Sequence, residues 1–194
     1  LKGRAAPAGE TRTLAAEEPL CLRVAGGPSF TIMRTPGEDR ELAAGFLLAE
    51  GLIRGAHDLL SLAGCPDDCD TLLATLAEGA GRPALRNMAV GSSCGLCGRM
   101  DVSSLMAELE PVKGGVSVPL RVLYEIPGRV RGEQKLFQET GGTHAAALFD
   151  NEGRILALRE DLGRHNAFDK AIGWAVLGGT PMDGTGAFLT GRVT

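Results

Sequence analysis

The first half of the chain alternates short apolar runs with glycine- and proline-rich turns. Ser29–Arg34 alternates apolar and polar residues, which predicts a strand. The next residues, Thr35-Pro36-Gly37-Glu38, carry helix-start signals: a threonine that can cap, a proline suited to the first helical position, and a glutamate three residues after the cap. Apolar residues then recur near one face, which predicts a helix over about 37–53. Short helices are also predicted at Thr71–Glu78 and Val102–Leu109.

The second half predicts a hairpin followed by a helix. Two apolar segments, Ala145–Phe149 and Arg154–Arg159, are separated by a four-residue turn of Asp, Asn, Glu and Gly. A helix is predicted from about Asn166 to Leu177, because Asn166 with Asp169 three residues later resembles a capping box. The other predicted elements are a connector at Tyr124–Gly132, a tight glycine turn at Gly141–His144 and a strand at Ala187–Val193.

Composition and charge exclude several classes of protein. The chain has 194 residues, 44% of them hydrophobic, which is enough for one domain or a two-lobed domain with a real core. Its net charge of −4 argues against a general nucleic-acid binder, and no apolar run approaches the ~20 residues that cross a bilayer. The first residues lack the apolar middle of a secretory signal. We therefore expect a cytoplasmic protein without nucleic-acid or membrane partners.

The segment Ser92–Arg99 places two thiols, Cys94 and Cys97, two residues apart with a glycine after each. A thiol pair at this spacing binds a metal, transfers electrons or carries sulfur. An odd number of cysteines without a signal peptide argues against a disulfide framework. The other three cysteines are Cys21, Cys65 and Cys69.

Zinc binding and dithiol oxidation are two hypotheses for the function of this cysteine pair. Cys65-x3-Cys69 with Cys94-x2-Cys97 could supply four thiolates to a structural zinc ion, although the first spacing is loose for a zinc knuckle. A dithiol–disulfide oxidoreductase normally places its cysteines at the strand–helix junction of a βαβ unit, and no such unit is evident here.

Sulfur carriage is the third hypothesis for this cysteine pair. It requires an exposed, deprotonated cysteine on a pliable loop, and Gly95 and Gly98 supply the pliability. An ordinary thiol is mostly protonated at neutral pH. Arg99 and a nearby helix N-terminus could lower the thiol pKa.

Arg159–Lys170 is the densest polar cluster, with six charged residues and with His165 at a predicted helix start. Helix N-termini favour anions, and Arg164 and Lys170 could add phosphate contacts. The segment fits a solvated helix start with local ion pairs equally well. His144, after the glycine turn, could meet this site across the hairpin.

Four blocks of the chain together resemble a known family. They are Thr35-Pro36-Gly37 leading into Glu41–Gly51, Ser93–Gly98, Thr140–Ala146 and Arg159–Lys170. They resemble the formate dehydrogenase accessory sulfurtransferases of the FdhD type, occur in that family's order and cover most of residues 30–192.

The resemblance implies a sulfurtransferase. Such proteins accept persulfide sulfur from a cysteine desulfurase and pass it to the bis(guanine dinucleotide) molybdenum cofactor before formate dehydrogenase receives that cofactor. Cys94 would carry the sulfur, and Cys97 would assist by relaying or releasing it through exchange. The cofactor would be a bound client, with no permanently bound cofactor or metal. Its nucleotide part would be lined by Gly141, Gly142, Thr143, His144, Arg164, His165 and Asn166.

The resemblance also implies a dimer with a cytidine-deaminase-like α/β core, in which helices cover a mixed sheet in three layers. We expect a mobile tail at 1–18, an N-terminal subdomain with the cysteine loop at 19–110, and the deaminase-like core at 111–194. Family members usually continue further, so part of the cofactor-binding surface is expected beyond this sequence.

Two rival functions stay open. One is a zinc-stabilised scaffold that binds and chaperones the cofactor without moving sulfur. The other is an active nucleotide deaminase. The second is disfavoured, because the His-x-Glu motif of zinc deaminases is replaced here by His165-Asn166-Ala167.

Overall fold

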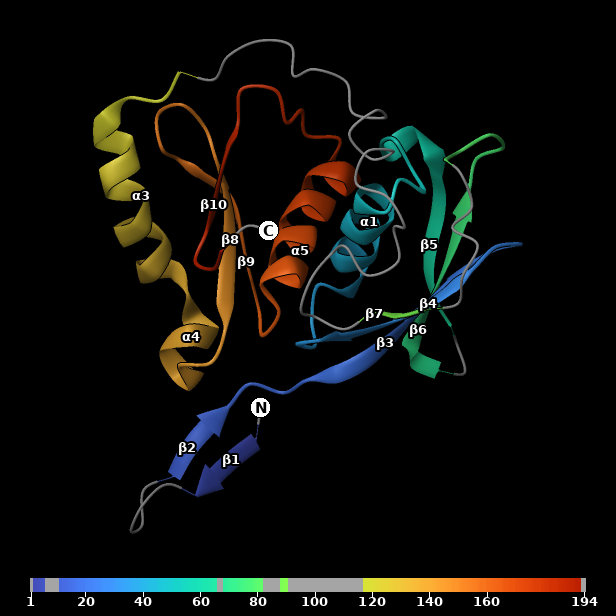
Figure 1. Cartoon of the computed structure of the whole chain (residues 1–194), viewed down its shortest axis with the longest axis horizontal. Coiled ribbons are helices and arrows are strands. Elements are labelled where there is room, and N and C mark those ends of the chain that lie inside the picture. Colours follow the sequence, from blue (N-terminus) through green and yellow to red (C-terminus); the bar gives the residue numbers. More distant parts are fainter. Residues whose placement is uncertain (1, 6–10, 66–67, 82–87, 91–116, 193–194) are drawn as a thin grey trace.

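The computed structural model describes residues 2–5, 11–65, 68–81, 88–90 and 117–192, and it confirms the predicted α/β class. Two sheets enclose a pair of helices, and a further helix covers the outer face of the smaller sheet (Figure 1). The described elements are β1 (Lys2–Ala5), β2 (Thr11–Leu14), β3 (Glu18–Val24), β4 (Ser29–Arg34), α1 (Asp39–Ala49), η2 (Ala56–Asp58), β5 (Leu59–Cys65), β6 (Asp68–Leu76), β7 (Met88–Val90), α3 (Leu120–Glu133), α4 (Lys135–Thr140), β8 (His144–Phe149), β9 (Ile155–Asp161), α5 (Arg164–Gly178) and β10 (Gly186–Leu189).

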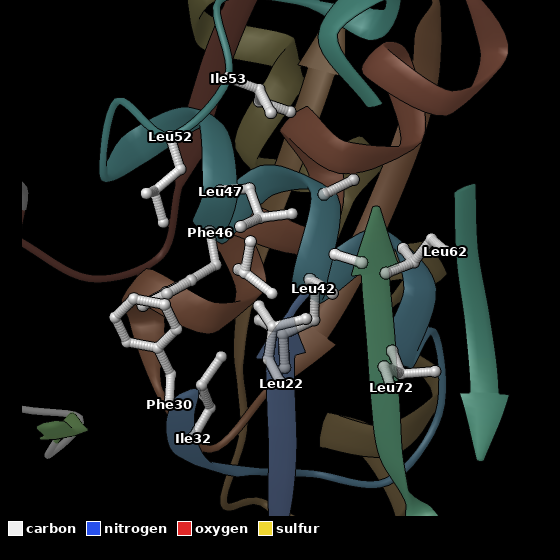
Figure 2. Close-up of a cluster of buried hydrophobic side chains, with 14 of the residues drawn as sticks. Leu22, Phe30, Ile32, Leu42, Phe46, Leu47, Leu52, Ile53, Leu62 and Leu72 are labelled. Carbon is white, nitrogen blue, oxygen red and sulfur yellow. The ribbon is translucent and has the colours of Figure 1, made fainter. Parts of the chain in front are cut away.

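The larger sheet has five described strands in the order β5-β6-β3-β4-β7. It is mixed, because β6 runs parallel to β3 and β7 runs parallel to β4, whereas the other pairs are antiparallel. Alternate residues of β3, Leu20 and Leu22, are fully buried in one cluster with α1 (Figure 2). In that cluster the Phe30 ring lies edge-on to Phe46, with 5.0 Å between centroids.

The smaller sheet is antiparallel throughout its described strands, in the order β10-β8-β9. β8 is apolar from Ala145 to Phe149, and both of its faces are covered. Ala145, Ala147 and Phe149 belong to the cluster under α3, whereas Ala146 and Leu148 belong to the cluster with α5. The resulting α3–sheet–α5 arrangement has three layers (Figure 1). The likeness to cytidine deaminases and the boundaries at 19 and 111 stay predictions.

Helices α1 and α5 lie antiparallel between the two sheets and approach each other through their backbones. A Cβ atom on Gly45 would lie 1.9 Å from the carbonyl oxygen of Asp169. A Cβ atom on Gly173 would lie 1.8 Å from the carbonyl oxygen of Glu41. Only glycine fits at either point, so this crossing fixes α5 against the start of α1.

Several predicted elements are confirmed, with small shifts at their ends. Ser29–Arg34 is strand β4, and the predicted hairpin is β8 and β9. The helices predicted over about 37–53 and 166–177 are α1 and α5. The strand predicted at Ala187–Val193 is β10, at Gly186–Leu189. The helix predicted at Val102–Leu109 lies outside the described residues.

Two predicted elements are wrong. Thr71–Glu78 was expected to be helical but lies mostly in β6, where pairing with β3 and β5 overrides local helix propensity. Tyr124–Gly132 was expected to be a connector but lies in α3, because Val122, Ile126 and Val130 bury one helical face despite Pro127. The segment predicted as a mobile tail, 1–18, includes the paired strands β1 and β2, and its mobility stays a prediction.

The expected threonine cap of α1 is also wrong. The N-cap is Glu38, whose φ of 52° makes it the one non-glycine residue with positive φ in the described part of the chain. Thr35 lies three residues earlier and contacts Asp161, Leu162 and Lys170.

Among the described helices, none combines the length and apolar character needed to cross a membrane.

Candidate functional site

The predicted glycine turn before β8 is confirmed. Gly141 closes α4 with φ 66°, a left-handed conformation that favours glycine, and its N–H donates to the Phe137 carbonyl at 2.7 Å. The N–H of Gly142 donates to Thr140 Oγ1 at 3.3 Å. Both glycines are exposed. The turn brings the chain from α4 directly to the start of β8.

Thr143 is buried, and its hydroxyl is used inside the protein. The hydroxyl donates to Glu160 Oε1 at 2.9 Å. The same carboxylate accepts the N–H groups of Leu136 and Phe137, each at 2.8 Å, at the start of α4. Glu160 of β9 therefore holds both the start of α4 and Thr143. Thr143 was predicted to line the nucleotide site.

His144 meets the start of α5 across the hairpin, as the sequence predicts. Its Nδ1 lies 3.4 Å from Thr190 Oγ1, which also accepts the N–H of Ala145 at 2.9 Å. A Cβ atom on Gly191 would lie 3.0 Å from Cδ of Arg164 and 3.3 Å from Cε1 of His144. The histidine, the arginine and the glycine backbone are therefore close neighbours.

Helix α5 begins with two of the predicted site residues. Gly163 is the N-cap, and Arg164 and His165 are the first helical residues, both partly exposed. The N-terminus of this 15-residue helix carries partial positive charge. We call His144, Arg164 and the next helical residue, His165, the histidine–arginine cluster. A guanidinium at a helix N-terminus suits a phosphate or another anion.

Asn166 does not cap α5, so the predicted capping box is wrong. It lies inside the helix and is buried. Its Nδ2 donates to the carbonyl oxygen of Met33 at 2.7 Å and to Asp161 Oδ1 at 3.1 Å. Asn166 therefore holds β4 against α5, and its amide nitrogen faces the interior.

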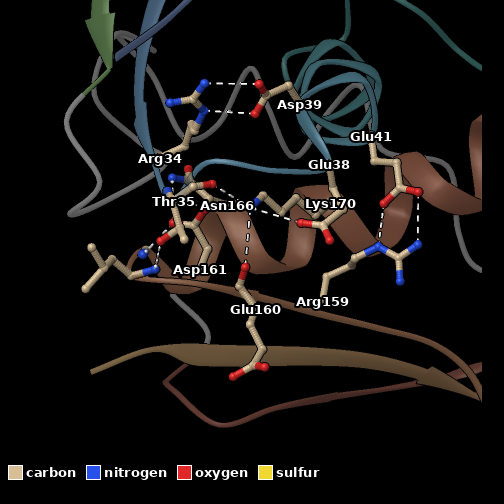
Figure 3. Close-up of polar contacts among 12 residues, drawn as sticks. Arg34, Thr35, Glu38, Asp39, Glu41, Arg159, Glu160, Asp161, Asn166 and Lys170 are labelled. Atoms are coloured by element: carbon tan, nitrogen blue, oxygen red, sulfur yellow. Dashed lines mark hydrogen bonds and ion pairs between the residues drawn. The ribbon is translucent and has the colours of Figure 1, made fainter. Parts of the chain in front are cut away.

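Lys170 of α5 and Asp161 of β9 form a buried ion pair (Figure 3). Lys170 and Asp161 are both fully buried, with 3.0 Å between Nζ and Oδ2. Lys170 Nζ also donates to the carbonyl oxygens of Thr35, at 2.9 Å, and Glu160, at 3.3 Å. The charges are thus paired and hydrogen-bonded, as burial requires. Lys170 is not available for the phosphate contact that the sequence suggested.

A cleft of about 680 Å³ lies beside this pair. It is lined by the Thr35–Glu38 turn, the α3–α4 junction and β9. On its wall the Arg159 guanidinium pairs with the Glu41 carboxylate, and this hydrogen bond raises the pKa of Arg159. No sequence signal pointed to the cleft, because its walls are far apart in the chain.

Comparison with known proteins identifies the family. A model of the FdhD/NarQ family matches residues 15–194. The chain belongs to this family. The matched range contains all four blocks that carried the resemblance.

Individual relatives agree with this family. A "Sulfur carrier protein FdhD" from Mycolicibacterium paratuberculosis is 44% identical over 195 residues, which cover 94% of this chain and 72% of the relative. Another from Mycobacterium tuberculosis is 43% identical, covering 84% of this chain and 64% of the relative. The chain thus spans about two thirds of these relatives' length.

A solved structure agrees with the fold. A protein from Desulfotalea psychrophila, whose crystal structure is described as that of a formate dehydrogenase accessory protein, matches with a TM-score of 0.72. The two chains are 22% identical, and the match covers 98% of this chain and 73% of the other.

The predicted sulfur carrier residues, Cys94 and Cys97, lie outside the described residues. The other three thiols are on the larger sheet: Cys21 lies in β3, Cys65 ends β5, and Cys69 is exposed in β6. In the described part of the chain, no three His, Cys, Asp or Glu side chains are arranged to hold a metal ion.

Proposed function

We propose that this chain carries sulfur from a cysteine desulfurase to the molybdenum cofactor in its guanine-dinucleotide form, for use by formate dehydrogenase. The observation that carries the proposal is the Cys94-x2-Cys97 pair within a chain of the FdhD/NarQ family. The relatives named sulfur carrier proteins support the same role.

Sulfur would be accepted by exchange at Cys94. The Cys94 thiolate attacks the terminal sulfur of the desulfurase persulfide, forming a new S–S bond while the old one breaks. The desulfurase cysteine leaves as a thiolate, and the proton stays on the transferred sulfur. No net oxidation occurs. Arg99 follows closely in the sequence and supplies positive charge, which favours the thiolate.

Release would use Cys97. Its thiolate attacks the Cys94 sulfur, expels hydrosulfide toward the cofactor and leaves a Cys94–Cys97 disulfide. A cellular dithiol then reduces this disulfide and restores both thiols. The step therefore needs two cysteines at short spacing, and the Cys94-x2-Cys97 pair provides them.

The histidine–arginine cluster would bind the nucleotide part of the cofactor. Arg164 supplies a guanidinium at the N-terminus of α5, where the partial positive charge of the helix favours phosphate. His144 lies next to Arg164, and the exposed glycine turn at 141–142 precedes it in the chain. Thr143 and Asn166 would support this site from behind, through Glu160 and Asp161. The protein would act in the cytoplasm as a homodimer.

Mass spectrometry tests the sulfur-carrying step. The protein is incubated with a cysteine desulfurase and L-cysteine, and its intact mass is measured with and without reductant. We expect a gain of one sulfur atom that reductant removes. The Cys94→Ala variant should lose the gain, and the Cys69→Ala variant, which removes an exposed thiol of the larger sheet, should keep it.

Two results would contradict this proposal. One is no gain of mass in the wild-type protein, and the other is a full gain in Cys94→Ala. Stoichiometric zinc that is lost on mutating Cys65 or Cys94 would favour the scaffold function instead.

A further inference from the structure

Thr35 directs all of its polar atoms toward the second half of the chain. It is buried and follows β4. Its N–H donates to Asp161 Oδ2 at 2.9 Å, and its carbonyl oxygen accepts from Lys170 Nζ at 2.9 Å. Its hydroxyl accepts the N–H of Leu162 at 3.0 Å (Figure 3). These partners lie at the end of β9, in the β9–α5 turn and in α5.

The hydroxyl contact holds the turn from which α5 begins. Leu162 and Gly163 form this turn, and the N–H of Gly163 donates to Asp161 Oδ1 at 2.8 Å. Arg164 and His165 follow immediately as the first helical residues. A shift of the turn would therefore move both side chains and the helix N-terminus together.

The residue before Thr35 is held by different partners. Arg34 is buried, and its guanidinium binds the Asp39 carboxylate at 2.8 and 3.0 Å and Asp70 Oδ1 at 3.1 Å. Asp39 begins α1, and Asp70 lies in β6. Arg34 thus attaches the end of β4 to α1 and β6, and Thr35 attaches it to β9 and α5. These contacts leave the β4–α1 turn little freedom to move.

We propose that Thr35 is a positioning residue for nucleotide binding: its hydroxyl sets the Leu162–Gly163 turn and thereby the direction of Arg164 and His165. This inference rests on the proposed function, because it assumes that the histidine–arginine cluster binds the nucleotide. Small misplacements of binding groups have large effects on affinity and rate. The Thr35 hydroxyl therefore contributes to nucleotide affinity as well as to the stability of the fold.

Two substitutions at position 35 separate the hydroxyl from the shape of the side chain. Thr35→Val keeps the β-branched shape and removes the acceptor, whereas Thr35→Ser keeps the acceptor. Thr71→Val is the matched control, because Thr71 is also buried and its hydroxyl donates to Asp68 Oδ2 at 2.6 Å in β6, within the larger sheet.

Binding of guanosine diphosphate, a nucleotide that carries guanine and a pyrophosphate, is measured by calorimetry for each full-length variant below its unfolding temperature. We expect Thr35→Val to weaken binding about five- to tenfold, the scale of one buried hydrogen bond. Thr35→Ser should stay within about twofold of wild type, and so should Thr71→Val.

The proposal is overturned if Thr35→Val binds the nucleotide as tightly as wild type. It is equally overturned if Thr71→Val loses as much affinity, because the loss would then follow general destabilisation. A wild type that takes sulfur on Cys94 but does not bind the nucleotide removes this inference while leaving the sulfur-carrying function standing.

Amide hydrogen exchange in the wild-type protein gives a second measurement that needs no variant. We expect the nucleotide to slow exchange of the Leu162 N–H, because ligand binding at Arg164 and His165 would stabilise the turn that Thr35 holds. Unchanged exchange at saturating nucleotide would also contradict the proposal, even if Thr35→Val failed to fold.

Discussion

The two sides of helix α5 differ in burial, in partners and in expected role. The inward side carries Asn166, Lys170 and Gly173, which are buried and contact β4, Asp161 or α1. The outward side of the N-terminus carries Arg164 and His165, which are partly exposed. One short motif therefore contains residues that hold the fold and residues suited to a ligand. Substitutions should separate the two groups by whether they change stability or affinity.

The largest expected effect is on the inward side, at Lys170. Replacing it by methionine leaves the Asp161 carboxylate buried without its counter-charge and should cost about 3–5 kcal/mol of unfolding free energy, measured by urea denaturation. Lys135→Met, at an exposed lysine of α4, is the control and should cost less than about 0.5 kcal/mol. Equal effects at the two lysines would show that the buried ion pair of Lys170 contributes no more to stability than an exposed lysine does.

The next effect is a pH dependence from Asp169, in the second turn of α5. Burial raises the pKa of this carboxyl from 3.8 to about 7, with smaller contributions from the charges of Glu50 and Asp161. The folded state thus binds the proton more tightly than the unfolded chain. The contribution of Asp169 to stability is therefore greatest at low pH, falls as pH rises from about 4 to about 7 and is then constant.

Asp169→Asn should remove this pH dependence. Between about pH 5 and pH 8 the wild type should lose roughly 3 kcal/mol of unfolding free energy relative to the variant. Urea denaturation of both proteins at several pH values gives the difference directly. A constant difference across this range would show that the carboxyl titrates normally.

A smaller effect is expected at the crossing of α1 and α5. A methyl group at position 173 would overlap the Glu41 carbonyl, so Gly173→Ala should destabilise the protein by about 2 kcal/mol. Gly128→Ala in α3 has the opposite expectation: a Cβ there meets nothing within 4 Å, and alanine should add about 0.5–1 kcal/mol. Thermal unfolding of the two variants compares them directly.

The fold was predictable where local patterns and tertiary contacts agree. The hairpin β8–β9 and helices α1 and α5 follow from periodicity and turn residues in the sequence. Strand β6 did not, because Thr71–Glu78 also fits a helix and only pairing with β3 and β5 decides its structure. Helix α3 was missed: Tyr124–Gly132, which contains Pro127 and Gly128, was predicted to be a connector, whereas burial of Val122 and Ile126 maintains the helix.

The candidate site was predictable in its location and less so in its roles. The motifs placed His144 near the Arg159–Lys170 segment, and the structure confirms that it neighbours Arg164. They did not reveal that Asn166 and Lys170 point inward, because the same polar residue types serve as ligands or as buried partners. Only the long-range contacts of Met33 and Thr35 distinguish the two uses.

The smallest expected effect on stability is on the outward side, at Arg164. Arg164→Gln keeps much of the side-chain volume and should change unfolding free energy by no more than about 1 kcal/mol. Because a charged hydrogen bond to phosphate would be lost, affinity for guanosine diphosphate should fall about tenfold or more. Arg154→Gln is the control: this exposed arginine pairs with Asp150 in the β8–β9 turn. If both variants bound the nucleotide equally, phosphate binding would depend on overall charge, and the outward side of α5 would lose its assigned role.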